Sequence, residues 1–133
     1  MTARLVIDSR EPEASLILSA LDSNYFLAQT IHPGLDATAP VGSYMSDGLG
    51  DFFAELARDW RGWEGTRRWE SLEGELTLLA ESDRSGHVYV RVHLHDGAPA
   101  RWMVELRLTL EAGQLERLAA KAREFEELVI SAT

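Results

Sequence analysis

The sequence predicts an α+β fold, in which a long C-terminal helix packs across one face of a curved antiparallel sheet of about six to seven strands. Two segments in the second half of the chain alternate apolar and polar residues, as half-buried strands do. Two other segments repeat apolar residues at helical spacing, and turn sequences join the predicted strands. The predicted order is β-β-β-β-α-β-β-β-α within a single domain, 1–133, and the sequence has no internal repeat.

Four strands are predicted in the N-terminal third, at Leu5–Ile7, Ser15–Leu21, Tyr25–Ile31 and about Thr38–Met45. The segment 22–24 has the composition of a hairpin loop, and Pro33-Gly34 has that of a turn. Because proline donates no backbone hydrogen bond, Pro40 places the fourth strand at a sheet edge or makes it irregular.

The middle of the chain predicts an amphipathic helix over 49–61, which we expect at one end of the sheet or over a flank. Its apolar stripe repeats every three or four residues: Leu49, Phe52, Phe53, Leu56 and Trp60. Asp47 is the predicted N-cap, and Gly62 is the predicted stop. Because Trp60 belongs to the stripe, we expect it in the core.

Three strands and a helix account for the rest of the chain. The first strand is predicted over Trp69–Glu81, with these residues facing inward: Leu72, Gly74, Leu76, Leu78 and Ala80. The next two, over 87–95 and 101–110, carry an apolar residue at every even position, and turns at 83–86 and 96–99 join the three. The helix is predicted from about Glu111 to about Val129, with this apolar stripe: Leu115, Leu118, Ala119, Ala122, Phe125 and Val129.

The chain carries 22 acidic and 13 basic side chains, a net charge of −9. This charge opposes binding to nucleic acid phosphates and suits a basic protein partner, although it also serves solubility alone. The absence of cysteine excludes disulfides, thiolate metal sites and cysteine catalysis. No apolar run approaches the ~20 residues that cross a bilayer, and the N-terminus has no signal-peptide pattern, so we expect a cytoplasmic protein without membrane contact.

The polar side of the strand at 87–95 is the first candidate site, because residues two apart share one face: His87, Tyr89, Arg91, His93 and His95. His93 and His95 have a spacing that metal sites use, and Glu105 on the next strand is a better third ligand than Asp96. Arg91 in the same row would repel a cation. We therefore expect a solvated face and no metal.

The same face could instead line a pocket of a small-molecule-binding protein or an enzyme, built from Tyr89, Arg91, His93, His95 and Glu105. His93 or His95 beside Glu105 or Glu75 would supply a base and an orienting carboxylate. The chain has no nucleophile elbow, phosphate loop or zinc-protease motif, so no catalytic residue and no cofactor is predicted.

A segment rich in tryptophan and arginine, 60–69, is the second candidate site. Trp63 and Trp69 flank a glycine-containing loop, so we expect at least one of them to be partly exposed. Together with Arg67 and Arg68 they are of the residue types most often found as binding hot spots. Stacking of arginine on indole could equally fix this loop to its own domain.

Acidic side chains form the third candidate surface. Along the predicted helix 49–61 and its N-cap they recur at four-residue spacing and so form one ridge: Asp47, Asp51, Glu55 and Asp59. Others cluster near the start of the chain: Asp8, Glu11 and Glu13. Such a ridge repels itself unless a basic partner meets it, or it is simply a solvated face.

Four segments carry a resemblance: Trp60-Arg61-Gly62-Trp63-Glu64-Gly65, Trp69-Glu70-Ser71-Leu72-Glu73-Gly74-Glu75-Leu76, Gly86-His87-Val88 and Leu110-Glu111-Ala112-Gly113-Gln114-Leu115-Glu116. Through them, and most specifically through the W-x-G-W-x-G element, the chain resembles a bacterial family of uncharacterised single-domain proteins from about residue 45 onward. That resemblance implies no known activity. In shape and charge the chain also looks like small acidic immunity proteins that neutralise secreted or contact-delivered toxins, which implies a protein partner.

We therefore expect a non-catalytic, immunity-like domain that occludes a surface of a protein partner with these residues: Asp51, Glu55, Asp59, Trp63, Arg67, Arg68 and Trp69. The alternative is a small-molecule binder or enzyme that uses the polar sheet face. Self-association through that face or an edge strand is a third hypothesis, and the sequence leaves open whether the protein is a monomer or a homodimer.

Overall fold

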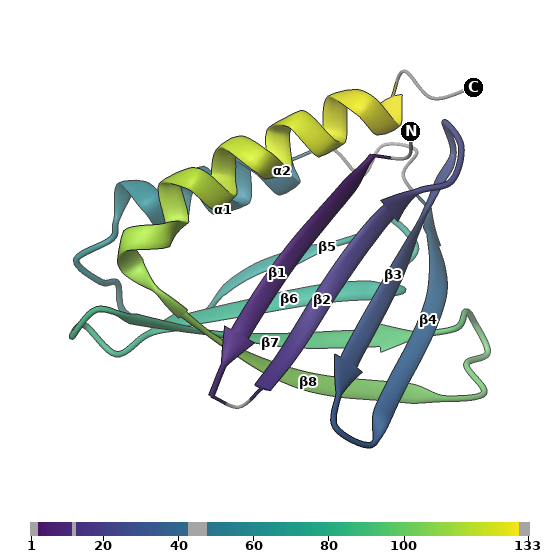
Figure 1. Ribbon diagram of the computed structural model, residues 1–133, viewed down its shortest axis with the longest axis horizontal. Helices are drawn as coiled ribbons and strands as arrows, with labels where there is room; N and C mark the ends of the chain where they lie inside the picture. Colours follow the sequence, from purple (N-terminus) through teal and green to yellow (C-terminus); the bar gives the residue numbers. More distant parts are fainter. Residues whose placement is uncertain (1–2, 12, 43–47, 131–133) are drawn as a thin grey trace.

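The computed structural model describes residues 3–11, 13–42 and 48–130, and Figure 1 shows how they are arranged. The elements follow one another as β1 (Arg4–Arg10), β2 (Glu13–Ala20), β3 (Tyr25–His32), β4 (Leu35–Gly42), α1 (Leu49–Arg58), β5 (Arg67–Glu70), β6 (Leu76–Ser82), β7 (His87–His95), β8 (Met103–Glu111), the 3₁₀ turn η1 (Ala112–Gln114) and α2 (Leu115–Ile130).

The strands form two four-stranded antiparallel sheets, so the prediction of one larger sheet is wrong. Sheet A has the order β1-β2-β3-β4, and sheet B has the order β5-β6-β7-β8. The chain leaves sheet A for α1 before β5 begins, and within the described residues β4 pairs with β3 alone and β5 with β6 alone. Strand twist favours this division, because eight strongly twisted strands pack better as two sheets than as one.

The two sheets meet where β1 runs beside β8. There the buried Ser9 hydroxyl accepts a hydrogen bond from the backbone N–H of Thr109 at 2.9 Å. β1 and β8 are edge strands of different sheets and are not paired by a ladder of backbone hydrogen bonds, so this side-chain hydrogen bond links them instead. It holds one sheet against the other where β1 and β8 meet.

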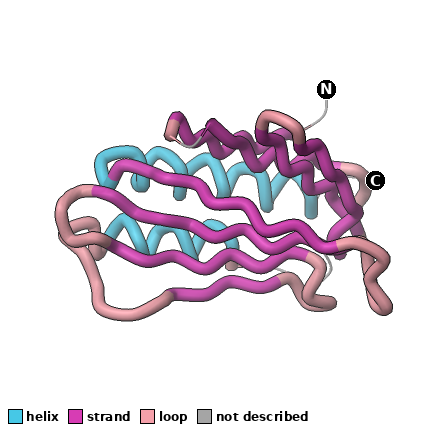
Figure 2. The backbone as a smooth tube through the Cα atoms, turned by 90° about the horizontal axis from the view of Figure 1, so that it is seen from below, coloured by secondary structure: helices cyan, strands magenta, loops and turns pink. Residues whose placement is uncertain are grey.

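One apolar core is shared by both sheets and both helices. α2 packs against α1, β1 and β2, and the ring of Phe125 on α2 meets that of Phe26 on β3 edge-on, with 5.8 Å between centroids. Figure 2 shows the helices behind sheet B, on the side away from the viewer. The predicted placement of the C-terminal helix over an apolar sheet face is therefore confirmed, and the predicted stripe of α2 is buried.

The alternation predicted for β7 and β8 is confirmed. On β7 the even positions are all at most 2% exposed: Val88, Val90, Val92 and Leu94. On β8 the buried positions are also even: Leu106, Leu108 and Leu110. The odd positions of both strands therefore face outward together.

The strand predicted over Trp69–Glu81 is instead two strands, β5 and β6, joined by a tight turn. Gly74 has a φ of +79°, which favours glycine, and its N–H donates to the Ser71 carbonyl at 2.9 Å. Leu72 is consequently 58% exposed rather than inward. The alternation was misleading here because two residues of the expected apolar face, Leu72 and Gly74, lie in the turn and not in a strand.

The helix α1 buries Leu49, Phe52, Phe53 and Leu56 as predicted, but it ends at Arg58. Trp60 therefore leaves the stripe and is 54% exposed, so its expected core position is wrong. Asp47, the predicted N-cap, and the end of the predicted fourth strand at Met45 lie outside the described residues.

The long C-terminal helix begins later than expected. Glu111 still belongs to β8, and η1 turns the chain before α2 starts at Leu115. Pro40 lies on β4, an edge of sheet A as described, in agreement with the prediction. In the described ranges, neither helix has both the length and the apolar composition required to cross a bilayer.

Candidate functional site

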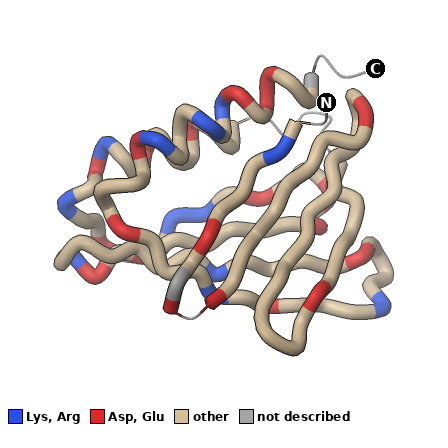
Figure 3. The backbone as a smooth tube through the Cα atoms, viewed as in Figure 1, with Lys and Arg blue, Asp and Glu red and all other residues tan. Residues whose placement is uncertain are grey.

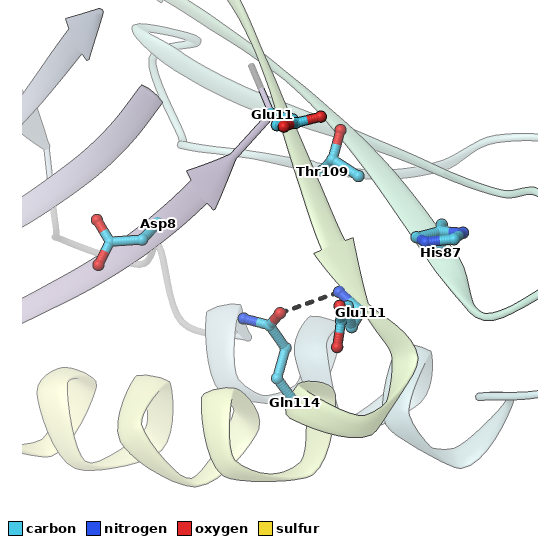
Figure 4. Close-up of a pocket in the computed structure, with 6 residues that line it drawn as sticks. All are labelled: Asp8, Glu11, His87, Thr109, Glu111 and Gln114. Carbon is cyan, nitrogen blue, oxygen red and sulfur yellow. Dashed lines mark hydrogen bonds between the residues drawn. The ribbon is translucent and has the colours of Figure 1, made fainter. Parts of the chain in front are cut away.

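A cleft opens at the seam between the two sheets, and we call it the seam cleft (Figure 4). It has a volume of about 710 Å³ and is lined by Asp8, Glu11, His87, Thr109, Glu111 and Gln114. β1 and the turn after it supply the first two residues, the start of β7 supplies His87, and the end of β8 with η1 supplies the others. The seam cleft therefore exists only when the two halves of the chain are packed together.

Three carboxylates and one imidazole determine the chemistry of the seam cleft. Asp8 accepts a hydrogen bond from the Ser15 hydroxyl at 2.7 Å. Glu111 and Gln114 form a capping box, in which the Gln114 side chain accepts from the Glu111 N–H at 2.9 Å. Among the described side chains, no lysine or arginine forms an ion pair with any of the three carboxylates. Such a space favours a cationic group.

Basic side chains are missing from a long stretch of the sequence. No lysine or arginine occurs between Arg10 and Arg58, whereas seven acidic residues do. In Figure 3 the strands β2, β3 and β4 accordingly carry no basic residue, and most of the basic residues lie on the helices and on sheet B with its loops. The strands β2, β3 and β4 thus carry negative charge and no positive charge, whereas β1 carries Arg4 and Arg10 as well as Asp8.

The acidic ridge of α1 is met by basic side chains of the same chain. Arg67 lies 2.7 Å from Asp59 and 3.7 Å from Glu55, and Arg123 on α2 lies 3.1 Å from Asp51. These intramolecular pairs relieve the self-repulsion that would otherwise call for an outside partner. The Arg123–Asp51 pair is exposed and contributes little to stability, whereas Arg67 and Asp59 are half-buried.

The two tryptophans predicted as hot spots lie in the core. Trp63 is 7% exposed and Trp69 is 8% exposed, so the expectation that one of them is partly exposed is wrong. The Trp63 indole N–H donates to the Ala80 carbonyl at 3.3 Å, and the Arg67 guanidinium lies 4.8 Å from its ring centroid. This stacking fixes the loop to its own domain, and the exposed indole of the segment is that of Trp60.

The histidines of β7 do not converge on one point. His93 Nε2 lies 2.8 Å from Glu105 Oε1, which forms the imidazole–carboxylate pair that the sequence suggested. His87 Nδ1 lies 3.0 Å from Asp83 Oδ2, and His95 Nδ1 accepts a backbone hydrogen bond in the following turn. Within the part of the chain that the structure describes, no group of three His, Asp or Glu side chains is placed to hold a metal ion.

Two turn aspartates order the ends of β7. Asp83 accepts from the backbone N–H groups of Ser85 at 2.8 Å and His87 at 3.0 Å, and the Ser85 hydrogen bond does most to lower the pKa of Asp83. At the other end, the Arg101 backbone N–H donates to Asp96 at 2.8 Å and lowers the pKa of that carboxyl. Both carboxylates therefore have a structural part in their turns.

The outer face of sheet B is open, because no described helix or strand lies in front of it in Figure 2. The seam cleft takes His87 from β7 but none of the predicted pocket residues: Tyr89, Arg91, His93, His95 and Glu105. The arginines of this face have partners within the sheet: Arg68 pairs with Glu70, Arg91 pairs with Glu81, and Arg107 stacks on the Tyr89 ring.

A family model matches residues 7–128, and its description is a family of unknown function, DUF6228. The chain belongs to this family. The match spans both sheets, whereas the resemblance seen in the sequence begins at about residue 45. No curated protein matches the chain.

In this member of DUF6228, the seam cleft is the feature that sequence reasoning missed. Asp8 and Glu11 stand out as acidic residues near the start of the chain, but nothing local places Glu111 beside them. Spacing within a segment reports which residues share a face and does not report which distant edges meet. The nearest available signal was the Glu111-x-x-Gln114 capping pattern, which marks the passage from strand to helix.

Proposed function

We propose that this protein is a non-catalytic protein-binding domain that occludes a surface of a basic partner, in the manner of an immunity protein. The observation that carries the proposal is the seam cleft, where Asp8, Glu11 and Glu111 border one space of about 710 Å³. A lysine or arginine side chain of the partner would supply the cation that no described side chain supplies there. Charge-assisted hydrogen bonds of this kind are roughly twice as strong as neutral ones.

The distribution of charge supports the same kind of partner. The net charge of −9 would steer a basic protein toward the domain, and the stretch without basic residues leaves only negative charges on β2, β3 and β4. The acids of α1 are already paired with Arg67 and Arg123, so Asp51, Glu55 and Asp59 have a smaller part in this proposal than the seam cleft.

The small-molecule or enzymatic alternative has weaker support. Its most suggestive feature is the His93–Glu105 pair at 2.8 Å. Both side chains of that pair are open to water, because His93 is 38% exposed and Glu105 is 59% exposed. A general base of this kind usually acts in a concave site that holds its substrate.

The test compares two variants of equal net charge. The cleft variant combines Asp8→Asn, Glu11→Gln and Glu111→Gln, and the matched control combines three exposed acids elsewhere: Glu64→Gln, Glu116→Gln and Glu124→Gln. Both remove three negative charges. Binding of a ten-residue lysine peptide is measured by calorimetry at low and moderate salt, and proteins captured from a native lysate are identified by mass spectrometry.

We expect the cleft variant to bind the lysine peptide about tenfold more weakly or worse, and the control to change by less than about threefold. Captured proteins that require the cleft should be basic and should be lost from the cleft variant alone. Equal losses from both variants would show that net charge, and not the cleft, attracts these ligands, and the proposal would then be wrong.

A further inference from the structure

A second concave site lies at the opposite end of the strands from the seam cleft. This groove has a volume of about 390 Å³ and is lined by Asn24, Tyr25, Gly42, Leu72, Glu73 and Glu75. The start of β3, the end of β4 and the β5–β6 turn meet there, so both sheets contribute to it. We call it the hairpin groove.

A buried carboxylate lies in the hairpin groove. Glu75 is only 9% exposed, and it accepts hydrogen bonds from the Ser71 hydroxyl at 2.9 Å and from the Gly42 backbone N–H at 3.3 Å. Both donors are neutral, and among the described residues no basic side chain pairs with Glu75. Because a carboxylate can accept about four hydrogen bonds, Glu75 retains the capacity to bind a cationic donor.

Apolar surface borders this carboxylate. Tyr25 is 47% exposed and Leu72 is 58% exposed, although both are large side chains that are more often covered. Glu73 lines the same groove and is exposed. The hairpin groove thus combines an aromatic ring, an aliphatic wall and two carboxylates.

We propose that the hairpin groove binds an arginine side chain of a partner polypeptide. A guanidinium donates in a planar fork that matches a carboxylate, and it stacks on aromatic rings, so Glu75 and Tyr25 suit the two properties together. The aliphatic stem of the arginine would lie against Leu72. Charge complementarity argues for this occupant, because it supplies the cation that buried Glu75 lacks.

This inference does not depend on the proposed function, because the hairpin groove and the seam cleft share no residue. The probes are Nα-acetyl-arginine methylamide, its uncharged citrulline counterpart and its lysine counterpart. Each is titrated into the ¹⁵N-labelled full chain, and the backbone amide shifts are followed. We expect the arginine probe to shift the amides of Asn24, Tyr25, Gly42 and Glu73, and the other two probes to bind about tenfold more weakly or worse.

Glu75→Gln keeps the size of the side chain and should weaken the arginine probe about tenfold or more. In case that variant does not fold, Leu72→Ala with Glu73→Gln changes only exposed side chains of the groove and should weaken the probe about threefold or more. The matched control is Val6→Ala with Glu64→Gln, two exposed positions outside the groove, which should bind as the unaltered chain does.

Equal shifts with the citrulline or lysine probe, or unchanged binding in the groove variants, would overturn the inference. The cleft variant Asp8→Asn, Glu11→Gln, Glu111→Gln should retain the arginine shifts in the hairpin groove. The experiments therefore distinguish an error in the proposal for the seam cleft from an error in the proposal for the hairpin groove.

Discussion

Gly50 determines how closely the two helices approach each other. A Cβ atom added there would lie 2.2 Å from Arg123 Cγ and 2.9 Å from Glu126 Oε1. The missing side chain lets the Glu126 carboxylate accept from the backbone N–H groups of Leu49 at 3.0 Å and Gly50 at 2.7 Å. α2 thus caps the N-terminus of α1, where a negative charge is favourable.

We expect Gly50→Ala to destabilise the protein by roughly 1–2 kcal/mol, although alanine is a better helix former than glycine. The added methyl group must displace Arg123 and the capping carboxylate. The control is Gly113→Ala, because a Cβ atom at Gly113 would meet nothing within 4 Å. Urea unfolding of both variants measures the difference, and equal stability of the two would contradict this account of the helix contact.

For single residues, the sequence showed which segment is rich in tryptophan but did not predict which of its side chains are buried. It identified the 60–69 segment as rich in tryptophan, but it assigned Trp60 to the core and exposure to Trp63 or Trp69, and the structure reverses both assignments. The cause is the end of α1 at Arg58, because two residues beyond a helix end no longer follow its stripe.

Among the elements, the turn between β6 and β7 has its own organising group. Asp83 accepts from two backbone N–H groups and lies 3.0 Å from His87 Nδ1 and 3.2 Å from the Tyr89 hydroxyl. Its lowered pKa means that the ionised form is the one these donors favour. An aspartate with a folded pKa below its unfolded value contributes stability above the unfolded pKa, about 3.9, and loses that contribution as pH falls through the folded pKa.

We therefore expect Asp83→Asn to lower the melting temperature at pH 5–7, and the difference from the unaltered chain to shrink as pH falls below about 4. Thermal unfolding followed by circular dichroism between about pH 2 and 7 measures this gap. Asp36→Asn is a suitable control, because Asp36 accepts only a side-chain hydrogen bond from Gln29 among the described contacts. A gap that stays constant over the whole pH range would exclude ionisation of Asp83 as its source.

Element boundaries show where local patterns suffice and where they fail. The strands β7 and β8 could be predicted from the sequence because every even position is apolar, and their buried faces match this alternation. The β5–β6 turn could not be predicted, because Leu72 fits the alternation of a continuous strand, whereas Gly74 has the positive φ of a turn. A single glycine is a weaker signal than a run of apolar residues.

At the scale of the molecule, one core depends on both sheets. Buried residues of sheet A, sheet B, α1 and α2 form a single cluster, so no layer has an apolar interior of its own. We expect the whole chain to unfold in one cooperative transition. All four tryptophans lie between residues 60 and 102, so their fluorescence reports from outside sheet A.

Phe26→Leu tests this coupling, because Phe26 lies on β3 and contacts Phe125 across the core. The change should destabilise the protein by roughly 1–2 kcal/mol and shift the tryptophan fluorescence midpoint in urea as much as the circular dichroism midpoint. The unaltered chain provides the reference curves. Sheet A would be independent of sheet B if the fluorescence midpoint stayed in place while the circular dichroism curve moved.

The arrangement of the sheets and the seam cleft lay beyond what the sequence could predict. Hairpins join neighbours along the chain and can be inferred from turns, whereas the meeting of β1 with β8 joins residues such as Ser9 and Thr109, which are far apart in sequence. The seam cleft and the hairpin groove both form between the sheets, so their residues could be named as acidic or aromatic but not brought together.

Each half of the chain has the same plan, a four-stranded meander followed by a helix, although the sequence contains no repeat. A polypeptide with only one such half would expose the apolar face of its sheet to water. Two identical copies, related by a twofold axis, could cover each other's apolar faces. The present chain joins the two halves in one polypeptide, so that each half covers the apolar face of the other. Because the halves differ in sequence, the two ends of their junction can acquire different binding properties.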